Sequence, residues 1–168
     1  MDADIVNQSA GWDAAIWGTM IAVLALLALS AFFSGSETAL TAASRGKLHG
    51  LSDKGSRGAD VALRLTEDRE RLIGAVLLGN NLVNILATSL ATSALTLLFG
   101  DSGVALATLV MTALVLIFAE VMPKTYAITN AEVAAARVAP MIALVVRAFA
   151  PIVNAVRWLP DRSARRSG

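Results

Sequence analysis

Three short clusters of oxygen-bearing side chains interrupt otherwise apolar stretches of this sequence. They are SGSE at 34–37, GNNLVN at 79–84 and AEVMPK at 119–124. Together they offer hydroxyl, amide and carboxylate oxygens, and Glu120 is the acid of the third cluster. Such hard oxygen donors suit Mg²⁺, Ca²⁺ or Na⁺ and are poor ligands for Zn²⁺ or Cu²⁺. The clusters therefore predict a site for a hard cation.

The spacing of these residues indicates which of their oxygens can approach one ion. Asn80 and Asn84 are four residues apart and share one face of a helix, so their amide oxygens can approach one ion together. Pro123 has no backbone N–H, which leaves the carbonyl of Ala119 without its usual helical donor. The candidate oxygen donors are therefore the side chains of Ser34, Ser36, Asn80, Asn84 and Glu120, together with the backbone carbonyl of Ala119.

Each cluster also has a purely structural interpretation, which the sequence leaves open. Asparagine in a membrane helix often serves only to bond neighbouring helices together. Glu120 can pair with Lys124 four residues later, and serines commonly cap or pack helices. A single carboxylate leaves a divalent ion undercompensated, and such weak binding suits a transporter that must release its ion. The coincidence of three clusters in three apolar segments favours a shared site.

The clusters lie in a sequence that is poor in charge. Of the 168 residues, 56% are hydrophobic and 16% are charged, whereas a soluble domain carries about 25% charged residues. The composition indicates an integral membrane protein, the length leaves room for one domain, and the long apolar segments described below predict an all-α fold. The net charge of +1 argues against nucleic-acid binding. With no cysteine and one histidine, His49, the chain has no thiolate or multi-histidine metal site, and we expect no enzymatic activity and no catalytic residues.

Three apolar segments are long enough to cross a bilayer, which requires about 20 helical residues. They are 13–33, 72–98 and 104–122, with a tight turn at 99–103 between the second and the third. A fourth apolar stretch, 138–159, is interrupted by prolines and arginines.

The segment 36–70 is predicted to form cytoplasmic juxtamembrane helices. One runs over 36–51, broken by Gly46 and Gly50, and the next over 58–66. The run TEDRE at 66–70 is typical of the start of a helix.

The basic residues predict the orientation in the membrane. All 14 lie either between the first and second spans or after the third span, and none lies in 1–12 or 99–103. The positive-inside rule then places residues 1–12 outside and the C-terminus in the cytoplasm. A fourth crossing would export Arg162, Arg165 and Arg166. The stretch 138–159 is therefore predicted to be an interfacial or re-entrant helix, and a plain fourth span is the alternative.

The three motifs resemble those of the transmembrane domain of the CorC/CNNM magnesium transporters, the cyclin-M-type transmembrane module. The similarity rests on SGSETAL at 34–40, GNNLVN at 79–84 and EVMPK at 120–124, and it covers about residues 13–160. It implies a homodimer in the bilayer, with three membrane helices per subunit and a belt of cytoplasmic helices. It also implies a Mg²⁺ ion held by Ser34, Asn80, Asn84 and Glu120, with Na⁺ as the coupling ion.

The resemblance further implies a cytoplasmic CBS-domain pair after the membrane domain. Residues 161–168 are expected to be a cytoplasmic tail, and regulatory CBS domains are absent from this sequence. The family often has glycine where Ala119 stands here. We therefore expect magnesium transport across a bacterial cytoplasmic membrane, as Na⁺-coupled export by alternating access. The alternative is a Mg²⁺-sensing or scaffolding membrane protein that regulates other transporters.

Overall fold

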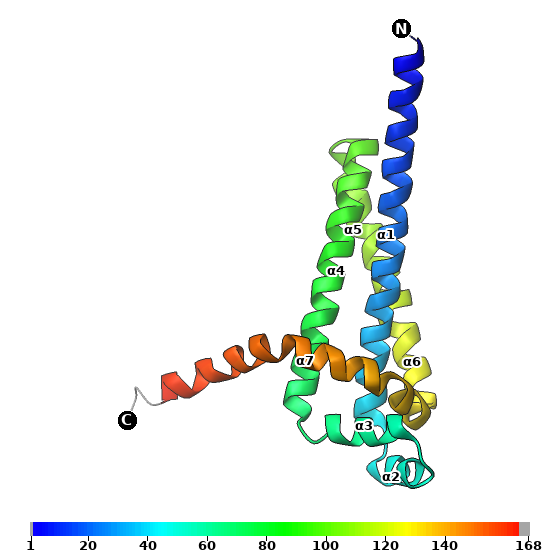
Figure 1. The fold of residues 1–168 in the computed structure, drawn as a ribbon. Helices are drawn as coiled ribbons and strands as arrows, with labels where there is room; N and C mark the ends of the chain where they lie inside the picture. The colour runs from blue at the N-terminus through cyan, green and yellow to red at the C-terminus, as the bar shows by residue number, and fades with distance from the viewer. Residues whose placement is uncertain (1, 165–168) are drawn as a thin grey trace.

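The computed structural model describes residues 2–164, and within that range every element is helical. This confirms the all-α fold class. The elements are α1 (Asp2–Ala42), α2 (Arg45–Asp53), α3 (Arg57–Leu65), α4 (Arg69–Phe99), α5 (Ser102–Leu114), η1 (Val115–Val121), α6 (Met122–Thr129) and α7 (Ala131–Ala164). Figure 1 shows α1, α4 and the α5–η1–α6 column running alongside one another, with α2 and α3 at one end of this bundle.

The turns around α4 follow from local residue chemistry. Asp68 is the N-cap, and its carboxylate accepts a hydrogen bond from the backbone N–H of Arg71 at 3.0 Å. The helix ends at Gly100, whose φ of 62° is a left-handed conformation that glycine adopts without steric cost. A Cβ on Gly103 would lie 2.3 Å from the carbonyl oxygen of Leu95, so glycine lets α5 turn back closely against α4. The predicted start of α4 and the predicted turn are confirmed.

The inner end of α1 differs from the prediction. A helix was expected over 36–51 with breaks at Gly46 and Gly50, but α1 continues through Ser36 to Ala42 and both glycines lie inside α2. A glycine inside a helix costs about 1 kcal/mol relative to alanine. Packing outweighs this cost here, because Leu48 of α2 is fully buried in the core. The next helix, α3, agrees with its predicted range within one residue at each end.

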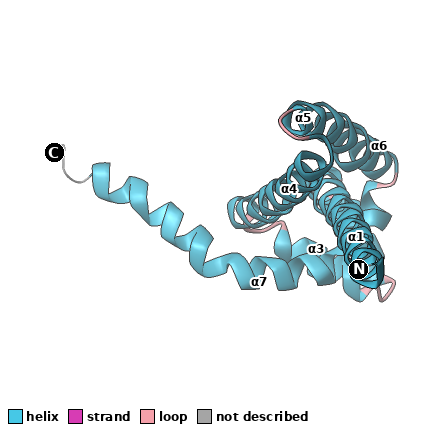
Figure 2. Cartoon of the chain, turned by 90° about the horizontal axis from the view of Figure 1, so that it is seen from above, coloured by secondary structure: helices cyan, strands magenta, loops and turns pink. Residues whose placement is uncertain are grey.

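Four helical segments are long and apolar enough to cross a membrane, where the sequence analysis expected three. They are Ala15–Ala42, Arg69–Phe99, Ser102–Thr129 and Ala131–Val153. The first three correspond to the predicted spans. The fourth, in α7, has a different direction from the others. Figure 1 shows α7 crossing α1 and α4 at a steep angle, and Figure 2 shows its C-terminal half leading away from the bundle.

The first half of α7 is held against the bundle by a regular stripe of buried residues. Ala135, Ala139, Ile142 and Val146 recur at helical spacing and join the main core. The contact with α3 is especially close, because a Cβ on Gly58 would lie 1.9 Å from the carbonyl oxygen of Ala136. The crosswise position of α7 is therefore fixed by packing.

Large apolar side chains also cover the outside of the bundle. Trp17 on α1, Ile85 on α4 and Leu109 on α5 are 65%, 64% and 72% exposed. Soluble monomers rarely expose contiguous apolar surfaces of this extent. This outward-facing apolar surface, together with the long apolar helices, is that of a membrane protein.

Candidate cation site

Glu120 lies at the centre of a hydrogen-bond network that joins α1, α4 and η1. Its Oε2 atom accepts a hydrogen bond from Oγ of Ser34 at 3.1 Å, and its Oε1 atom accepts one from Nδ2 of Asn80 at 3.1 Å. Behind Asn80, Oγ of Ser30 donates to Oδ1 of the amide at 2.8 Å. Three of the predicted ligands, from three separate segments of the sequence, thus meet at one carboxylate.

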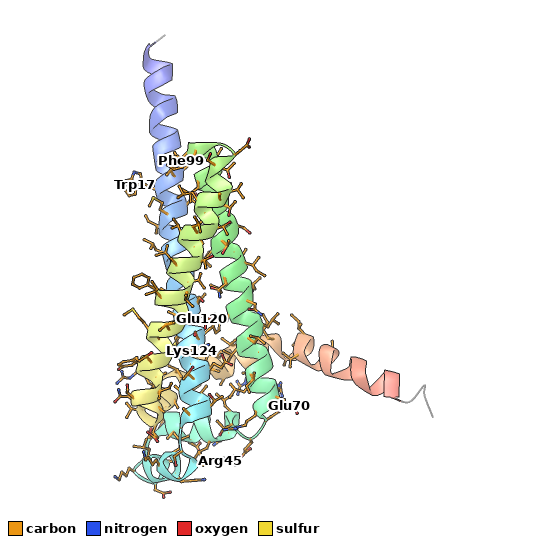
Figure 3. The ribbon with its side chains drawn as sticks, turned by 180° about the vertical axis from the view of Figure 1, so that it is seen from behind. Trp17, Arg45, Glu70, Phe99, Glu120 and Lys124 are labelled. Carbon is orange, nitrogen blue, oxygen red and sulfur yellow. The ribbon has the colours of Figure 1, made fainter. Side chains whose placement is uncertain are left out.

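The same carboxylate carries an ion pair. Nζ of Lys124 lies 2.7 Å from Oε2 of Glu120, and Figure 3 shows the two residues on successive turns. The structural interpretation, in which Glu120 pairs with Lys124 four residues later, is therefore confirmed. The pair coexists with the hydrogen bonds from Ser34 and Asn80, so Glu120 has more partners than a simple surface pair.

The network is buried on the side of α1 and more open at the carboxylate. Ser30 and Ser34 are fully buried and Asn80 is 8% exposed, whereas the side chain of Glu120 is 27% exposed. Buried polar groups need partners, and the serines and the amide supply them to one another and to the acid. The result is a pre-formed set of oxygens around an acid that is only partly covered by the rest of the chain.

Asn84 lies outside this network but shares a cavity with Glu120. Its Oδ1 atom is buried and has no hydrogen-bond partner. The cavity has a volume of about 380 Å³ and lies between α4, α5 and η1. Its lining residues are Asn84, Thr88, Thr108, Met111, Thr112, Val115, Leu116 and Glu120. Asn80 and Asn84 were predicted to share one helix face. In the structure, the amide of Asn80 bonds to Glu120 and Asn84 lines the adjoining cavity.

Two threonines give this cavity hydroxyl oxygens that act as acceptors. The hydroxyl of Thr108 donates to the carbonyl of Val104 at 2.9 Å, and that of Thr112 donates to the carbonyl of Thr108 at 2.6 Å. A hydroxyl has one hydrogen to give and two lone pairs. Once the hydrogen is bound within the helix, the oxygen is left as an acceptor, which suits a cation or its water shell.

The two further candidates, Ser36 and Ala119, are both buried. Oγ of Ser36 has no hydrogen-bond partner. Leaving a buried hydroxyl without a hydrogen bond costs about 1–3 kcal/mol of folding free energy. A bound cation that accepted this oxygen as a ligand would remove that cost. Ala119 is fully buried and lies beside Glu120 in η1.

The backbone that carries Glu120 is a π-helix, which the sequence analysis did not anticipate. η1 covers Val115–Val121, and the N–H of Met122 donates to the carbonyl of Ile117, five residues earlier. Pro123 follows directly. Such π-helical stretches are rare and often lie at functional sites.

Two glycines allow the three segments to meet. A Cβ on Gly79 would lie 2.9 Å from the ring of Phe33, and one on Gly35 would lie 3.4 Å from Cβ of Pro123. Both glycines lie in regular α-helix. They bring α1 close to α4 on one side and to α6 on the other, at the level of the network.

Ser30 is the functional candidate that the sequence analysis missed. It precedes Ser34 by four residues and so lies on the same face of α1. The i,i+4 spacing that singled out the two asparagines was therefore also present in α1.

The chemistry of the site is that of one carboxylate among neutral oxygens. Over the part of the chain that the structure describes, no three His, Cys, Asp or Glu side chains come together as a metal cluster. A bound cation would therefore be held by a single formal charge, by hydroxyls and by amides. A set of donors of this kind suits a hard cation that is held weakly enough to be released.

Comparison with known proteins gives several relatives. The chain is 40% identical to a UPF0053 protein of Haemophilus influenzae over 139 residues, which are 83% of this chain and 32% of the relative. It is 50% identical to the UPF0053 inner membrane protein YfjD of Escherichia coli over 99 residues, which are 59% of this chain and 23% of that protein. A polyamine export protein of Haemophilus influenzae is 29% identical over 162 residues, 89% of this chain and 37% of the relative.

The chain thus spans between 23% and 37% of the length of these relatives. The family described as the cyclin M transmembrane N-terminal domain matches residues 20–168, which is most of the sequence. On this match and on its helical membrane fold, the chain belongs to the cyclin M transmembrane domain family.

Proposed function

We propose that this chain is the membrane domain of a Mg²⁺ transporter, working by alternating access as a Na⁺-coupled exporter. The observation that carries the proposal is the meeting of Ser34, Asn80 and Glu120 from three membrane helices at one carboxylate. Glu120 supplies the negative charge. The hydroxyl and the amide replace part of the water shell of the ion, and Asn84 supplies a further oxygen from the cavity beside Glu120.

The amide of Asn80 can serve the site in two orientations. In the structure its Nδ2 faces Glu120 and its Oδ1 faces Ser30. A half-turn of the amide would direct Oδ1 toward a cation next to Glu120. Ser30 can follow this change, because a hydroxyl that donates to Oδ1 can equally accept from Nδ2. The network therefore has one hydrogen-bonded state without an ion and a second with one.

The arrangement in the membrane is part of the proposal. The N-terminus lies outside, α1, α4 and the α5–η1–α6 column cross the bilayer, and α7 lies along the inner surface with its C-terminus in the cytoplasm. The steep angle of α7 to the bundle supports this. So do Arg137 and Arg147, which are both exposed on α7 and can extend toward lipid headgroups. A homodimer and a following CBS-domain pair complete the proposed assembly.

Flux through the purified chain tests the proposal directly. The protein is reconstituted into liposomes containing a Mg²⁺-sensitive dye, with and without a Na⁺ gradient. We expect Mg²⁺ flux for the wild type and none for Glu120→Gln, which keeps the shape of the side chain and removes its charge. The alternative, a Mg²⁺ sensor or scaffold, would bind the ion without flux. Binding with no flux in the wild type would reject transport.

A second cargo is favoured by one specific observation. The ammonium of Lys124 lies 2.7 Å from Glu120, so the carboxylate already accepts a primary ammonium group of the kind that ends a polyamine. One relative carries the name polyamine export protein. Radiolabelled spermidine in the same liposomes separates the two cargoes, because a Mg²⁺ transporter moves Mg²⁺ in the absence of spermidine.

A further inference from the structure

The ammonium of Lys124 contacts the carboxylate that carries the negative charge of the proposed cation site. Its Nζ lies 2.7 Å from Oε2, the atom that also accepts the hydrogen bond from Ser34 at 3.1 Å. The other oxygen, Oε1, is bonded to Asn80. A cation placed among Ser34, Asn80 and Glu120 would therefore meet the ammonium on the same carboxylate. Two cations so close in a partly desolvated site repel each other strongly.

Lys124 also has a second acidic side chain that attracts it. Glu37 of α1 attracts Lys124 electrostatically, and it lies one helical turn beyond Ser34 on the same helix. At this level α1 and α6 are held close, with Gly35 against Pro123. The side chain of Lys124 is 43% exposed and has a flexible four-carbon stem. Rotation about the bonds of this stem can turn the ammonium away from Glu120 and toward Glu37.

We propose that Lys124 is a tethered counter-ion. Its ammonium holds the carboxylate of Glu120 when no cargo is bound, and it moves toward Glu37 when a cation enters. This inference rests on the proposed cation transport and concerns the regulation of the same site. Because the competitor is part of the chain, it is always present at high effective concentration. It lowers the affinity for the cation and, on returning to Glu120, drives the cation out.

A purely structural salt bridge makes the opposite prediction. An i,i+4 pair that only stabilises the helix would, on losing its lysine, leave Glu120 less well held and the cation bound no better. A tethered competitor, once removed, leaves a vacant carboxylate that binds the cation more tightly. The sign of the change in affinity therefore separates the two roles.

Isothermal titration of the purified chain with MgCl₂ measures this sign. We expect Lys124→Met to bind Mg²⁺ at least about tenfold more tightly than the wild type. Lys54→Met, which removes an exposed lysine outside the membrane helices, is the control for net charge and should leave the affinity unchanged. In liposomes, Lys124→Met should lower the maximal Mg²⁺ flux, because bound ion is no longer displaced.

A second variant tests the inference with Lys124 in place. Glu37→Gln removes the alternative partner of the lysine and should weaken Mg²⁺ binding roughly threefold or more. The double variant Glu37→Gln/Lys124→Met should bind like Lys124→Met alone, because Glu37 acts through the lysine. If Lys124→Met does not fold, the Mg²⁺ affinity of Glu37→Gln decides. Weaker binding supports the inference, and unchanged or tighter binding overturns it.

Two further results would overturn the inference. If the wild type binds Mg²⁺ and folded Lys124→Met binds it equally or less tightly, Lys124 is a structural partner and the proposed function stands. If the wild type binds no Mg²⁺, both the proposed magnesium transport and this inference fail.

Discussion

The hydroxyl of Ser30 donates a 2.8 Å hydrogen bond to the side-chain oxygen of Asn80, joining α1 to α4 directly behind the acid. We expect Ser30→Ala to leave this amide oxygen buried and unpaired, which costs about 1–3 kcal/mol of stability. It should also weaken Mg²⁺ binding, because the amide loses the partner that allows both of its orientations. Thermal unfolding and Mg²⁺ titration measure the two effects. Ser36→Ala is the matched control for stability, since the Ser36 hydroxyl has no hydrogen-bond partner to lose. An equal loss of stability in both variants would contradict this role of Ser30.

The two asparagines should separate stability from binding. Asn80→Ala removes two hydrogen bonds and should lower both the melting temperature and the Mg²⁺ affinity. Asn84→Ala removes an amide oxygen without a partner, so it should leave the melting temperature unchanged while reducing Mg²⁺ affinity by about tenfold, the effect of one lost charge-assisted contact. Asn84→Ala with normal affinity would remove Asn84 from the site.

The contact between Gly79 of α4 and the ring of Phe33 of α1 should not tolerate an added methyl group. Gly79→Ala places a Cβ 2.9 Å from the ring of Phe33, and overpacking of this kind costs about 1–3 kcal/mol. Gly18→Ala is the matched control, because its Cβ would have no atom within 4 Å. Thermal unfolding in detergent compares them, and the double variant Gly79→Ala/Phe33→Leu should recover part of the loss. A neutral Gly79→Ala would mean that the helices can move apart freely.

The chain has no cysteine, which makes its orientation easy to measure. Single variants are labelled in intact cells with a membrane-impermeant maleimide. Asp101→Cys, in the turn between α4 and α5, should react from outside, whereas His49→Cys in α2 should react only after the cells are opened. Ser163→Cys, at the end of α7, distinguishes three crossings from four. Its labelling from outside would establish a fourth crossing and reject the proposed position of α7.

Much of the fold and of the site follows from local sequence signals. The apolar segments, the cap at Asp68 and the turn at Gly100 were predictable because each depends on neighbouring residues alone. Ser34, Asn80 and Glu120 could be grouped because polar side chains in apolar segments seek one another. The continuation of α1 through Ser36 and the helical glycines of α2 were not predictable, since they depend on packing between segments distant in sequence.

The details of the site depend on geometry that spacing does not contain. The sequence placed Asn80 and Asn84 on one helix face, but it could not show that Asn80 bonds to Glu120 while Asn84 lines the cavity beside it. The partner of Asn80, Ser30, could have been found from its four-residue spacing to Ser34. The widened turns of η1 could not, because an α-helical period was assumed throughout the third span.

Those turns have an angular consequence. Thr112 and Glu120 are eight residues apart, and in an uninterrupted α-helix of 3.6 residues per turn they would point about 80° away from each other. Both nevertheless line the same cavity, because the π-helical turns between them add fewer degrees per residue and absorb the difference. The α5–η1–α6 column thus has two parts, α5 and the segment that begins in η1, which are rotated relative to each other about the column axis. One presents acceptor oxygens to the cavity and the other presents the acid. Under the proposed function, the relative rotation of the two parts decides whether a cation meets both at once.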